Sequence, residues 1–319
     1  MKFKRETPAG LLLGGMLAVM TVASAGAQAP QPTDGELLAS GLQGTIGGTI
    51  GPDGALYVPE GALGMVTRID PETGDATTFA SGLPPAEELG AIDVAFVDDT
   101  AYVLVTLLAP DHVGGGIYRV DDADTFTVIA DLGAFSVAHP PPYPVDVATG
   151  LQFALLPVAD GFLVSDGHHN RVLHVTLAGE VSELITFGNE VPTGLAVSGT
   201  TVYMAEAGPV PHAPATGKVI SFGLDAPTAK DVASGYSLIV DVEFGPGGVL
   251  YAISQGDSPG TVPAGSPANP TSGKLLRVND DGTFSVLVDA LNLPTSLDFV
   301  GDTAFIVTLG GEVWKIDGV

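Results

Sequence analysis

Apolar and polar residues alternate along the chain in short runs that glycine, proline and aspartate separate. Runs such as ALYVPEG (55–61) and TAYVLVT (100–106) are also rich in β-branched and aromatic residues. A period of two in runs of this length predicts β-strands. No apolar stripe of helical period and useful length follows the N-terminal leader, so the sequence predicts an all-β fold.

One strand pattern recurs six times in the same register. The copies are ALYVPEG (55–61), TAYVLVT (100–106), GFLVSDG (161–167), TVYMAEA (201–207), VLYAISQ (249–255) and TAFIVTL (303–309). Each copy follows a tight turn and precedes a further strand, as GPDG (51–54) and MVTRID (65–70) do around the first. A repeat of about 50 residues with four short strands predicts a propeller blade.

The two ends of the repeat region complement each other. The sixth unit stops at Val319 without a fourth strand, and a spare copy, GELLASG (35–41), resembles the fourth strands ATTFASG (76–82) and AKDVASG (229–235). Pairing of this spare strand with the last unit would close the ring and remove two exposed sheet edges. We therefore predict one six-bladed β-propeller over 35–319, with blades at about 42–83, 89–133, 147–188, 191–235, 238–291 and 293–319 plus 35–41.

The first 27 residues have the features of a cleavable secretory signal. Lys2, Lys4 and Arg5 precede an apolar run over 11–22, and small-residue A-x-A frames follow it. Such a segment is removed after export, here by a cut after Ala25 or Ala27, and 28–34 then form a short linker. We expect a secreted or periplasmic protein with no membrane span, because no second apolar run has spanning length.

The composition limits the classes of partner that the protein is expected to bind. The chain has 37 Asp and Glu against 11 Lys and Arg, a net charge of −26, and it has no cysteine. A strongly acidic surface repels nucleic acid and anionic lipid but admits cations. Without disulfides, an exported protein must be held together by its core.

All long connections are predicted on one face of the ring. They are 107–115, 133–148, 208–216 and 255–273, whereas the opposite face has only short turns such as 70–75, 176–180 and 279–283. One-sided insertions in a repeat protein are typical of a binding face, although unselected drift of surface loops gives the same pattern. This face is expected to bind a small molecule, a glycan or a protein, through the candidate residues Asp166, His168, His169, His212, Gln255 and Asp257.

The stretch SDGHHNRVLHV (165–175) contains the most conspicuous candidate chemistry. His168 and His169 are candidate catalytic residues, and Asp166 precedes them by two and three positions. The stretch also resembles the signature of NHL-type blades, in which the aspartate and the arginine brace a loop. Under that interpretation Asp166 and Arg171 are structural. Both interpretations remain open from the sequence.

Four carboxylates form a candidate calcium site. Asp93 and Asp241 occupy the same position in the first strands of opposite blades, where the other blades have Gly47, Gly150, Gly194 and Ser296. Glu60 and Glu206 end second strands on the same face. Calcium prefers oxygen ligands, and clustered carboxylates also raise one another's pKa. The alternative is that each one caps local backbone amides or faces water.

Long stretches of the chain, among them GPDGALYVPEG (51–61), FLVSDGHHNRVLHV (162–175) and VDVEFGPGGVLYAISQGD (240–257), resemble the ScyD/ScyE family over roughly 35–319. This resemblance implies an exported β-propeller and implies no particular catalytic residues. We expect a non-catalytic binding protein or scaffold. The alternatives are a calcium-dependent hydrolase of the lactonase or gluconolactonase kind, or a role in oxidative assembly of a scytonemin-like metabolite.

Overall fold

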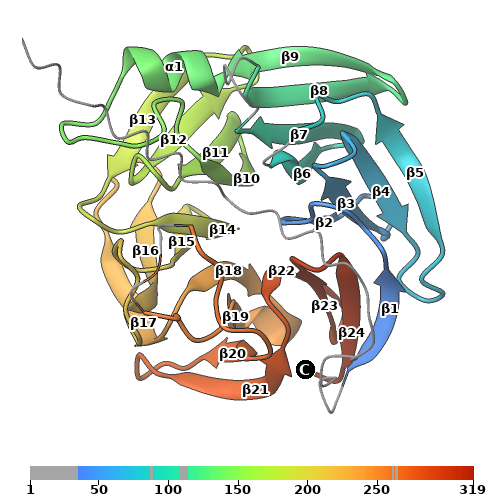
Figure 1. Ribbon diagram of the computed structural model, residues 1–319, viewed down its shortest axis with the longest axis vertical. Helices are drawn as coiled ribbons and strands as arrows, with labels where there is room; N and C mark the ends of the chain where they lie inside the picture. Colours follow the sequence, from blue (N-terminus) through green and yellow to red (C-terminus); the bar gives the residue numbers. More distant parts are fainter. Residues whose placement is uncertain (1–34, 87–88, 108–113, 261, 263–264) are drawn as a thin grey trace, which may run out of the picture.

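The chain folds into a six-bladed β-propeller, as the repeat predicted. The computed structural model describes residues 35–86, 89–107, 114–260, 262 and 265–319. Six antiparallel sheets of four strands surround a central axis, with the first strand of each sheet innermost (Figure 1). The predicted signal (1–27) and linker (28–34) lie outside the described residues.

In the first three blades each strand pairs with the next along the chain. Blade 1 contains β2 (Thr49–Ile50), β3 (Leu56–Glu60), β4 (Met65–Ile69) and β5 (Ala76–Ser81). Blade 2 contains β6 (Gly90–Val97), β7 (Thr100–Thr106), β8 (Gly116–Asp122) and β9 (Thr125–Asp131). Blade 3 contains β10 (Gln152–Val158), β11 (Gly161–Asp166), β12 (Arg171–Thr176) and β13 (Val181–Thr186).

The remaining blades follow the same order until the last strand. Blade 4 contains β14 (Pro192–Ser198), β15 (Thr201–Glu206), β16 (Gly217–Gly223) and β17 (Lys230–Tyr236). Blade 5 contains β18 (Ile239–Phe244), β19 (Leu250–Ser254), β20 (Gly273–Val278) and β21 (Phe284–Leu291). Blade 6 contains β22 (Pro294–Val300), β23 (Thr303–Thr308), β24 (Glu312–Asp317) and, as its outer strand, β1 (Glu36–Ser40) from the other end of the chain.

This pairing of β1 with β24 confirms the predicted closure. The strands are antiparallel, with Leu37 opposite Trp314 and Ser40 opposite Glu312. The backbone N–H of Leu42 then donates to the carbonyl oxygen of Gly311 at 3.1 Å and extends the contact beyond the strand. The first and last strands of the propeller therefore share one sheet.

The core consists of apolar layers between neighbouring blades. Between blades 6 and 1, Leu56 and Val58 pack against Phe305 and Val307, all fully or almost fully buried. Trp314 packs in the layer between blades 5 and 6. Because every blade is covered on both faces by its neighbours, the apolar surface is buried only in a complete ring.

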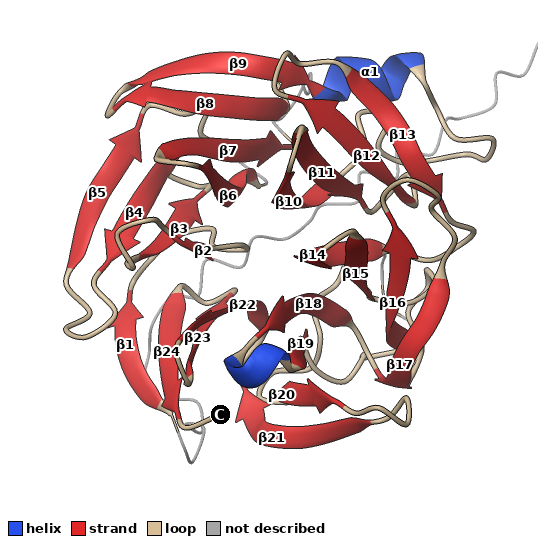
Figure 2. Cartoon of the chain, turned by 180° about the vertical axis from the view of Figure 1, so that it is seen from behind, coloured by secondary structure: helices blue, strands red, loops and turns tan. Residues whose placement is uncertain are grey.

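One helix contradicts the expectation that none would follow the leader. Helix α1 (Leu132–Ala138) lies at the start of the predicted loop 133–148, and the Asp131 carboxylate caps it by accepting from the Ala134 N–H at 2.7 Å. Seven residues are too few to give a recurring apolar stripe, so the periodicity did not reveal it. A 3₁₀ turn, η1 (Pro246–Gly248), also occurs (Figure 2). In the described ranges, no helix has the length and apolar character needed to cross a bilayer.

The order of the strands places the long connections on one face, which we call the long-loop face. They join β9 to β10 (132–151), β15 to β16 (207–216) and β19 to β20 (255–272). The last two loops touch, because the Ser258 hydroxyl donates to the carbonyl oxygen of His212 at 3.2 Å. The connections of the other face, the short-turn face, have a few residues each.

The closing strand offers a direct test of ring stability. Leu38 is partly buried against the layer between blades 6 and 1, whereas its neighbour Leu37 is 41% exposed. Leu38→Ala is expected to lower the free energy of unfolding by about 1–2 kcal/mol, below the range for a fully buried leucine. Leu37→Ala is the matched control, expected within about 0.5 kcal/mol of wild type in urea unfolding. Equal losses for both variants would mean that β1 does not dock through Leu38.

Candidate functional site

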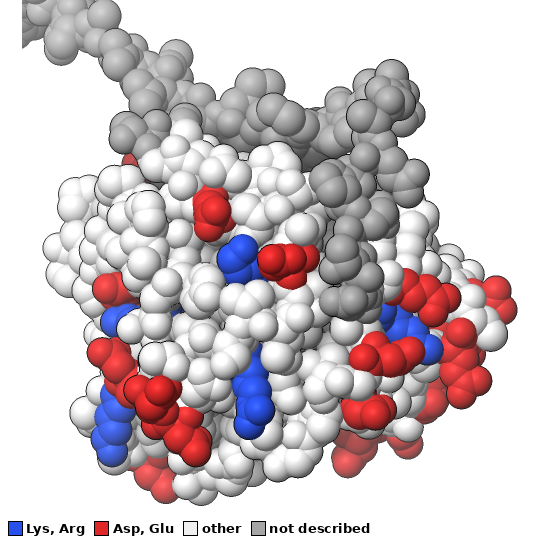
Figure 3. Space-filling model, turned by 90° about the horizontal axis from the view of Figure 1, so that it is seen from below, with Lys and Arg blue, Asp and Glu red and all other residues white. Residues whose placement is uncertain are grey.

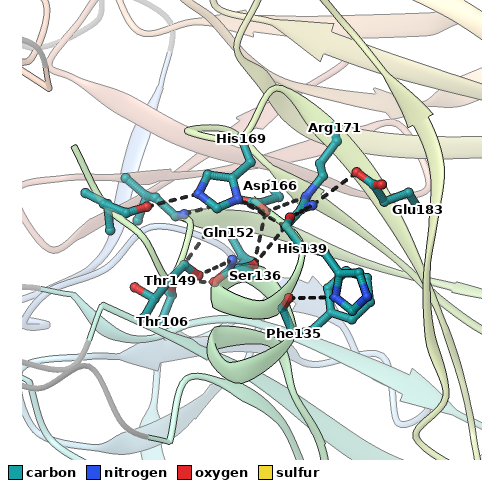
Figure 4. Close-up of polar contacts among 12 residues, drawn as sticks. Thr106, Phe135, Ser136, His139, Thr149, Gln152, Asp166, His169, Arg171 and Glu183 are labelled. Carbon is teal, nitrogen blue, oxygen red and sulfur yellow. Dashed lines mark hydrogen bonds and ion pairs between the residues drawn. The ribbon is translucent and has the colours of Figure 1, made fainter. Parts of the chain in front are cut away.

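The SDGHHN stretch forms a tight turn between β11 and β12. Asp166 ends one strand directly opposite Arg171, which begins the next, and Asn170 completes the turn with a φ of 50°. The Arg171 Nε–H donates to Asp166 Oδ2 at 3.0 Å, and both side chains are fully buried (Figure 4). The aspartate and arginine therefore brace the loop, as in the structural interpretation of the motif.

Arg171 also anchors helix α1 to blade 3. Its Nη2 donates to the Ser136 hydroxyl at 3.0 Å, and its Nη1 donates to the carbonyl oxygen of His139 at 2.8 Å (Figure 4). The Phe135 ring lies 5.5 Å from the guanidinium carbon, and Glu183 Oε2 accepts from Nη1 at 3.1 Å. These contacts tie the connection between blades 2 and 3 to the turn of blade 3.

His169 belongs to the same buried network. Its Nδ1 lies 3.0 Å from Arg171 Nη2, and its Nε2 lies 3.0 Å from the carbonyl oxygen of Val147. Arginine only donates and a carbonyl only accepts, so the ring accepts at Nδ1, donates at Nε2 and is neutral. Both nitrogens are thus occupied in the interior, where neither His169 nor Asp166 meets the surface.

His168 has a different environment, although it is the next residue. Its side chain is partly buried, and its ring makes no hydrogen bond within the described residues. Burial lowers the pKa of His168, and the negative charges of Asp166 and Asp146 oppose that shift. The result is a neutral imidazole on the long-loop face whose nitrogens have no partner in the part of the chain that the structure describes.

The other predicted ligand-binding residues lie on the two touching loops. Burial lowers the pKa of His212, and its Nδ1 has no hydrogen-bond partner in the part of the chain that the structure describes. It borders a cavity of about 10 Å³ beside Leu238, room for about one water molecule. Gln255 Oε1 accepts from the Ala268 N–H at 3.0 Å, and Asp257 is exposed.

Two of the four predicted calcium ligands are engaged within the long-loop face. Glu60 accepts from the Thr67 hydroxyl at 2.5 Å and from the Gln43 N–H at 2.8 Å. Glu206 is 1% exposed, and its Oε2 lies 3.2 Å from Lys218 Nζ. Burial raises the pKa of Glu206 to about 7, although Lys218 opposes this shift.

Asp93 and Asp241 connect neighbouring blades. Asp93 Oδ1 accepts from the Val94 N–H at 2.9 Å, and its Oδ2 accepts from the Leu155 N–H of blade 3 at 2.7 Å. Asp241 repeats the arrangement with Val242 at 2.9 Å and with Leu297 of blade 6 at 2.7 Å. The two aspartates form equivalent backbone clamps, from blade 2 to blade 3 and from blade 5 to blade 6.

The glycines at the equivalent positions of blades 1 and 4 make room for these clamps. A side chain at Gly47 would collide with the Asp93 carboxylate, and one at Gly194 would collide with that of Asp241. In blade 2 the residue after Asp93, Val94, pairs with Val103 of the second strand. In blade 3 the corresponding pair is Leu155 with Val164, so the residue before Leu155, Ala154, is the equivalent of Asp93. The assignment of Gly150 to this position was therefore wrong, because Gly150 precedes β10 and lies four residues before Ala154.

Two buried carboxyls of the innermost strands were missed by the sequence analysis. Glu243 lies two residues after Asp241 on β18, and Asp298 lies two after Ser296 on β22, so each shares a strand face with a residue of the predicted position. Burial raises the pKa of Glu243 to about 7 and that of Asp298 well above its usual value. Asp298 Oδ2 is buried without a hydrogen-bond partner among the described residues. The period-two signal was available but was not followed to these positions.

The structure does not bring Glu60, Asp93, Glu206 and Asp241 together as one ligand set. Glu60 and Glu206 contact Thr67 and Lys218 near the ends of second strands. Asp93 and Asp241 clamp innermost strands on opposite sides of the axis. Over 35–319, leaving out the masked positions, no group of three or more His, Asp or Glu side chains has the geometry of a metal site.

The buried Asp166–Arg171 pair predicts a large stability effect. Arg171→Met leaves Asp166 uncompensated in the interior and is expected to cost about 3–5 kcal/mol of unfolding free energy. The control is Arg68→Met, which breaks an exposed pair with Asp53 and is expected to cost less than about 1 kcal/mol. The double variant Asp166→Asn/Arg171→Met should recover part of the loss in denaturant unfolding. Similar losses for the two arginines would contradict a structural role for the motif.

The buried carboxyls of the innermost strands predict a pH-dependent stability. Glu243 has a pKa of about 7 in the folded chain, against about 4.3 when unfolded, so the folded state binds more protons between these values. Its contribution is fully present below pH 4 and is lost as the pH rises through 7. Glu243→Gln keeps an acceptor for the Phe244 N–H and is expected to be more stable than wild type at pH 8, but not at pH 4.5.

The control for this prediction is Glu180→Gln, at an exposed position of a short turn. Thermal unfolding across this pH range checks both variants, and the gain at pH 8 should not exceed about 4 kcal/mol. If wild type and Glu243→Gln lose stability in parallel as the pH rises, the buried glutamate is ionised in the folded protein.

Comparison with known proteins identifies the fold alone. The structure is similar to a gluconolactonase from Xanthomonas campestris, with a TM-score of 0.63 and 14% identity over 93% of this chain and 99% of that one. It is also similar to a PQQ-bound aldose sugar dehydrogenase from Streptomyces coelicolor, with a TM-score of 0.59 and 14% identity over 91% of this chain and 99% of that one. A chain of a nidogen–laminin complex is similar with a TM-score of 0.59 and 15% identity, over 83% of this chain and 89% of that one. No protein-family model and no curated protein sequence matches the chain. The chain is a six-bladed propeller, and its similarity to these three structures extends to the fold.

Proposed function

We propose that this chain is an exported binding protein of the ScyD/ScyE type, which holds a small molecule, a glycan or a protein on the long-loop face. The observation that carries the proposal is the distribution of hydrogen bonds. Asp166, His169 and Glu60 are committed to the protein's own loops, whereas His168 and Asp257 have no such side-chain bond in the described ranges. The groups left over suit recognition better than catalysis.

Charge restricts the class of ligand. The net charge is −26, and Figure 3 shows acidic side chains spread over one side of the molecule with fewer basic ones between them. A field of one sign repels anions and attracts cations. His168 is neutral at neutral pH because burial lowers its pKa, so it adds hydrogen bonding without charge. We therefore propose a neutral or cationic ligand.

The second candidate function is a lactonase-like hydrolase. The similarity to a gluconolactonase favours it, together with the neutral His168 imidazole, which has the protonation state of a general base. The four carboxylates do not fit a calcium ion in this arrangement. Asp93 and Asp241 each accept two backbone amide bonds and Glu206 pairs with Lys218, so a calcium ion would compete with these partners. The third option, oxidative assembly of a scytonemin-like metabolite, rests on the family resemblance alone.

A ligand screen with histidine variants tests the proposal. The purified chain is heated with panels of neutral glycans, lactones and amines, because a ligand of the folded state raises its melting temperature. The His168→Ala variant is expected to bind the ligand identified in the screen at least tenfold more weakly than wild type. His174→Ala is the control, because His174 is near the short-turn face and pairs with Asp160 at 3.0 Å.

The same preparation separates the two candidate functions. Lactone hydrolysis is followed with calcium and with EDTA, in wild type and in His168→Ala. Saturable binding without hydrolysis supports the binding protein. Calcium-dependent hydrolysis that His168→Ala abolishes would replace it with the hydrolase.

A further inference from the structure

One sizeable hollow of the described surface is on the face that the loop pattern did not single out. At the short-turn face, the ends of β6, β10 and β14 enclose an open hollow of about 420 Å³. Its walls include Phe96, Val97, Pro157, Val158, Val197 and Leu224. This volume lies within the range of small-molecule sites, about 300–1,000 Å³.

The walls of the hollow are parts of the rigid framework. Val97, Val158 and Val197 are the last or nearly last residues of the innermost strands of three consecutive blades. Each is partly buried and packs against an apolar layer between blades. A site with such walls is formed before any ligand arrives, so binding would order few side chains.

Charge is absent from the lining but present at the rim. None of the lining side chains is charged, and Thr200 is the only one with a hydroxyl group. Asp98 and Asp99 follow Val97 directly, Asp160 follows Ala159, and all three are exposed. Asp160 is paired with His174, whereas Asp98 and Asp99 have no side-chain ion pair within the described residues. An apolar hollow with an acidic rim complements a molecule that has an apolar body and a positive group.

We propose that this hollow binds a small amphipathic cation, with its ring or chain between Val158 and Val197 and its positive group beside Asp98 and Asp99. The site lies on the opposite face of the propeller from the long-loop face. It is therefore independent of the function proposed for that face. Anions with the same apolar body are repelled by the rim and should bind poorly.

Two matched probes test the proposal, 1-naphthylmethylammonium and 1-naphthaleneacetate. Titration calorimetry at low salt is expected to give saturable binding of the cation and at least tenfold weaker binding of the anion. The double variant Asp98→Asn/Asp99→Asn should bind the cation at least threefold more weakly. Its affinity for the anion should be unchanged or higher. Asp280→Asn, at an exposed short turn of blade 5, is the control and should change neither.

Blocking variants locate the binding. Ala159→Trp and Thr200→Trp each place a large side chain at an exposed lining position, on different blades, so one remains informative if the other misfolds. Each variant is expected to bind the cation at least tenfold more weakly than wild type. Leu177 is on the same face, is 45% exposed and lies outside the hollow. The control variant Leu177→Trp should therefore bind the cation as wild type does. Equal binding of both probes, or full binding by a folded blocking variant, would overturn the proposal.

Discussion

The contact between the first and last strands is the constraint on which the rest of the molecule depends. Each blade is apolar on both faces, so its stability comes from layers shared with two neighbours. An open ring would leave two such faces in water and an unpaired edge on β24. Pairing of β1 with β24 removes both penalties at once. With no cysteine in the chain, this noncovalent closure has to hold the ring unaided.

Polar clamps reinforce the ring at two opposite junctions. Asp93 and Asp241 each join two blades through backbone amides, and a glycine of the preceding blade makes room for each. Burial raises the pKa of both aspartates, so the innermost strands keep carboxyl groups that resist ionisation. The same residues that resembled metal ligands in the sequence therefore have a structural reason to occupy their positions. Chemistry-bearing residue types at repeated positions of a propeller can reflect the joints between blades.

The sequence was sufficient for the architecture because strands have a local signature. Period-two runs and the similarity of GELLASG to later fourth strands predicted the blades and their closure, which the structure confirms. It was not sufficient for the direction of individual side chains. His168 and His169 are adjacent, yet only His169 enters the buried network, and that difference depends on a turn containing a left-handed Asn170. Helix α1 was missed because seven residues carry no periodicity, although Asp131 at its start was a visible capping signal.

The two faces of the propeller offer different kinds of site for a physical reason. Long loops can carry polar groups such as Asp257, but they need their own bracing, and Arg171 supplies it for the loop of α1. Short turns add little surface, so the strand ends themselves form the walls at the other face. Those walls come from β6, β10 and β14, which lie far apart in the sequence. A hollow built in this way has no contiguous motif, and it becomes visible only when the blades are assembled around their axis.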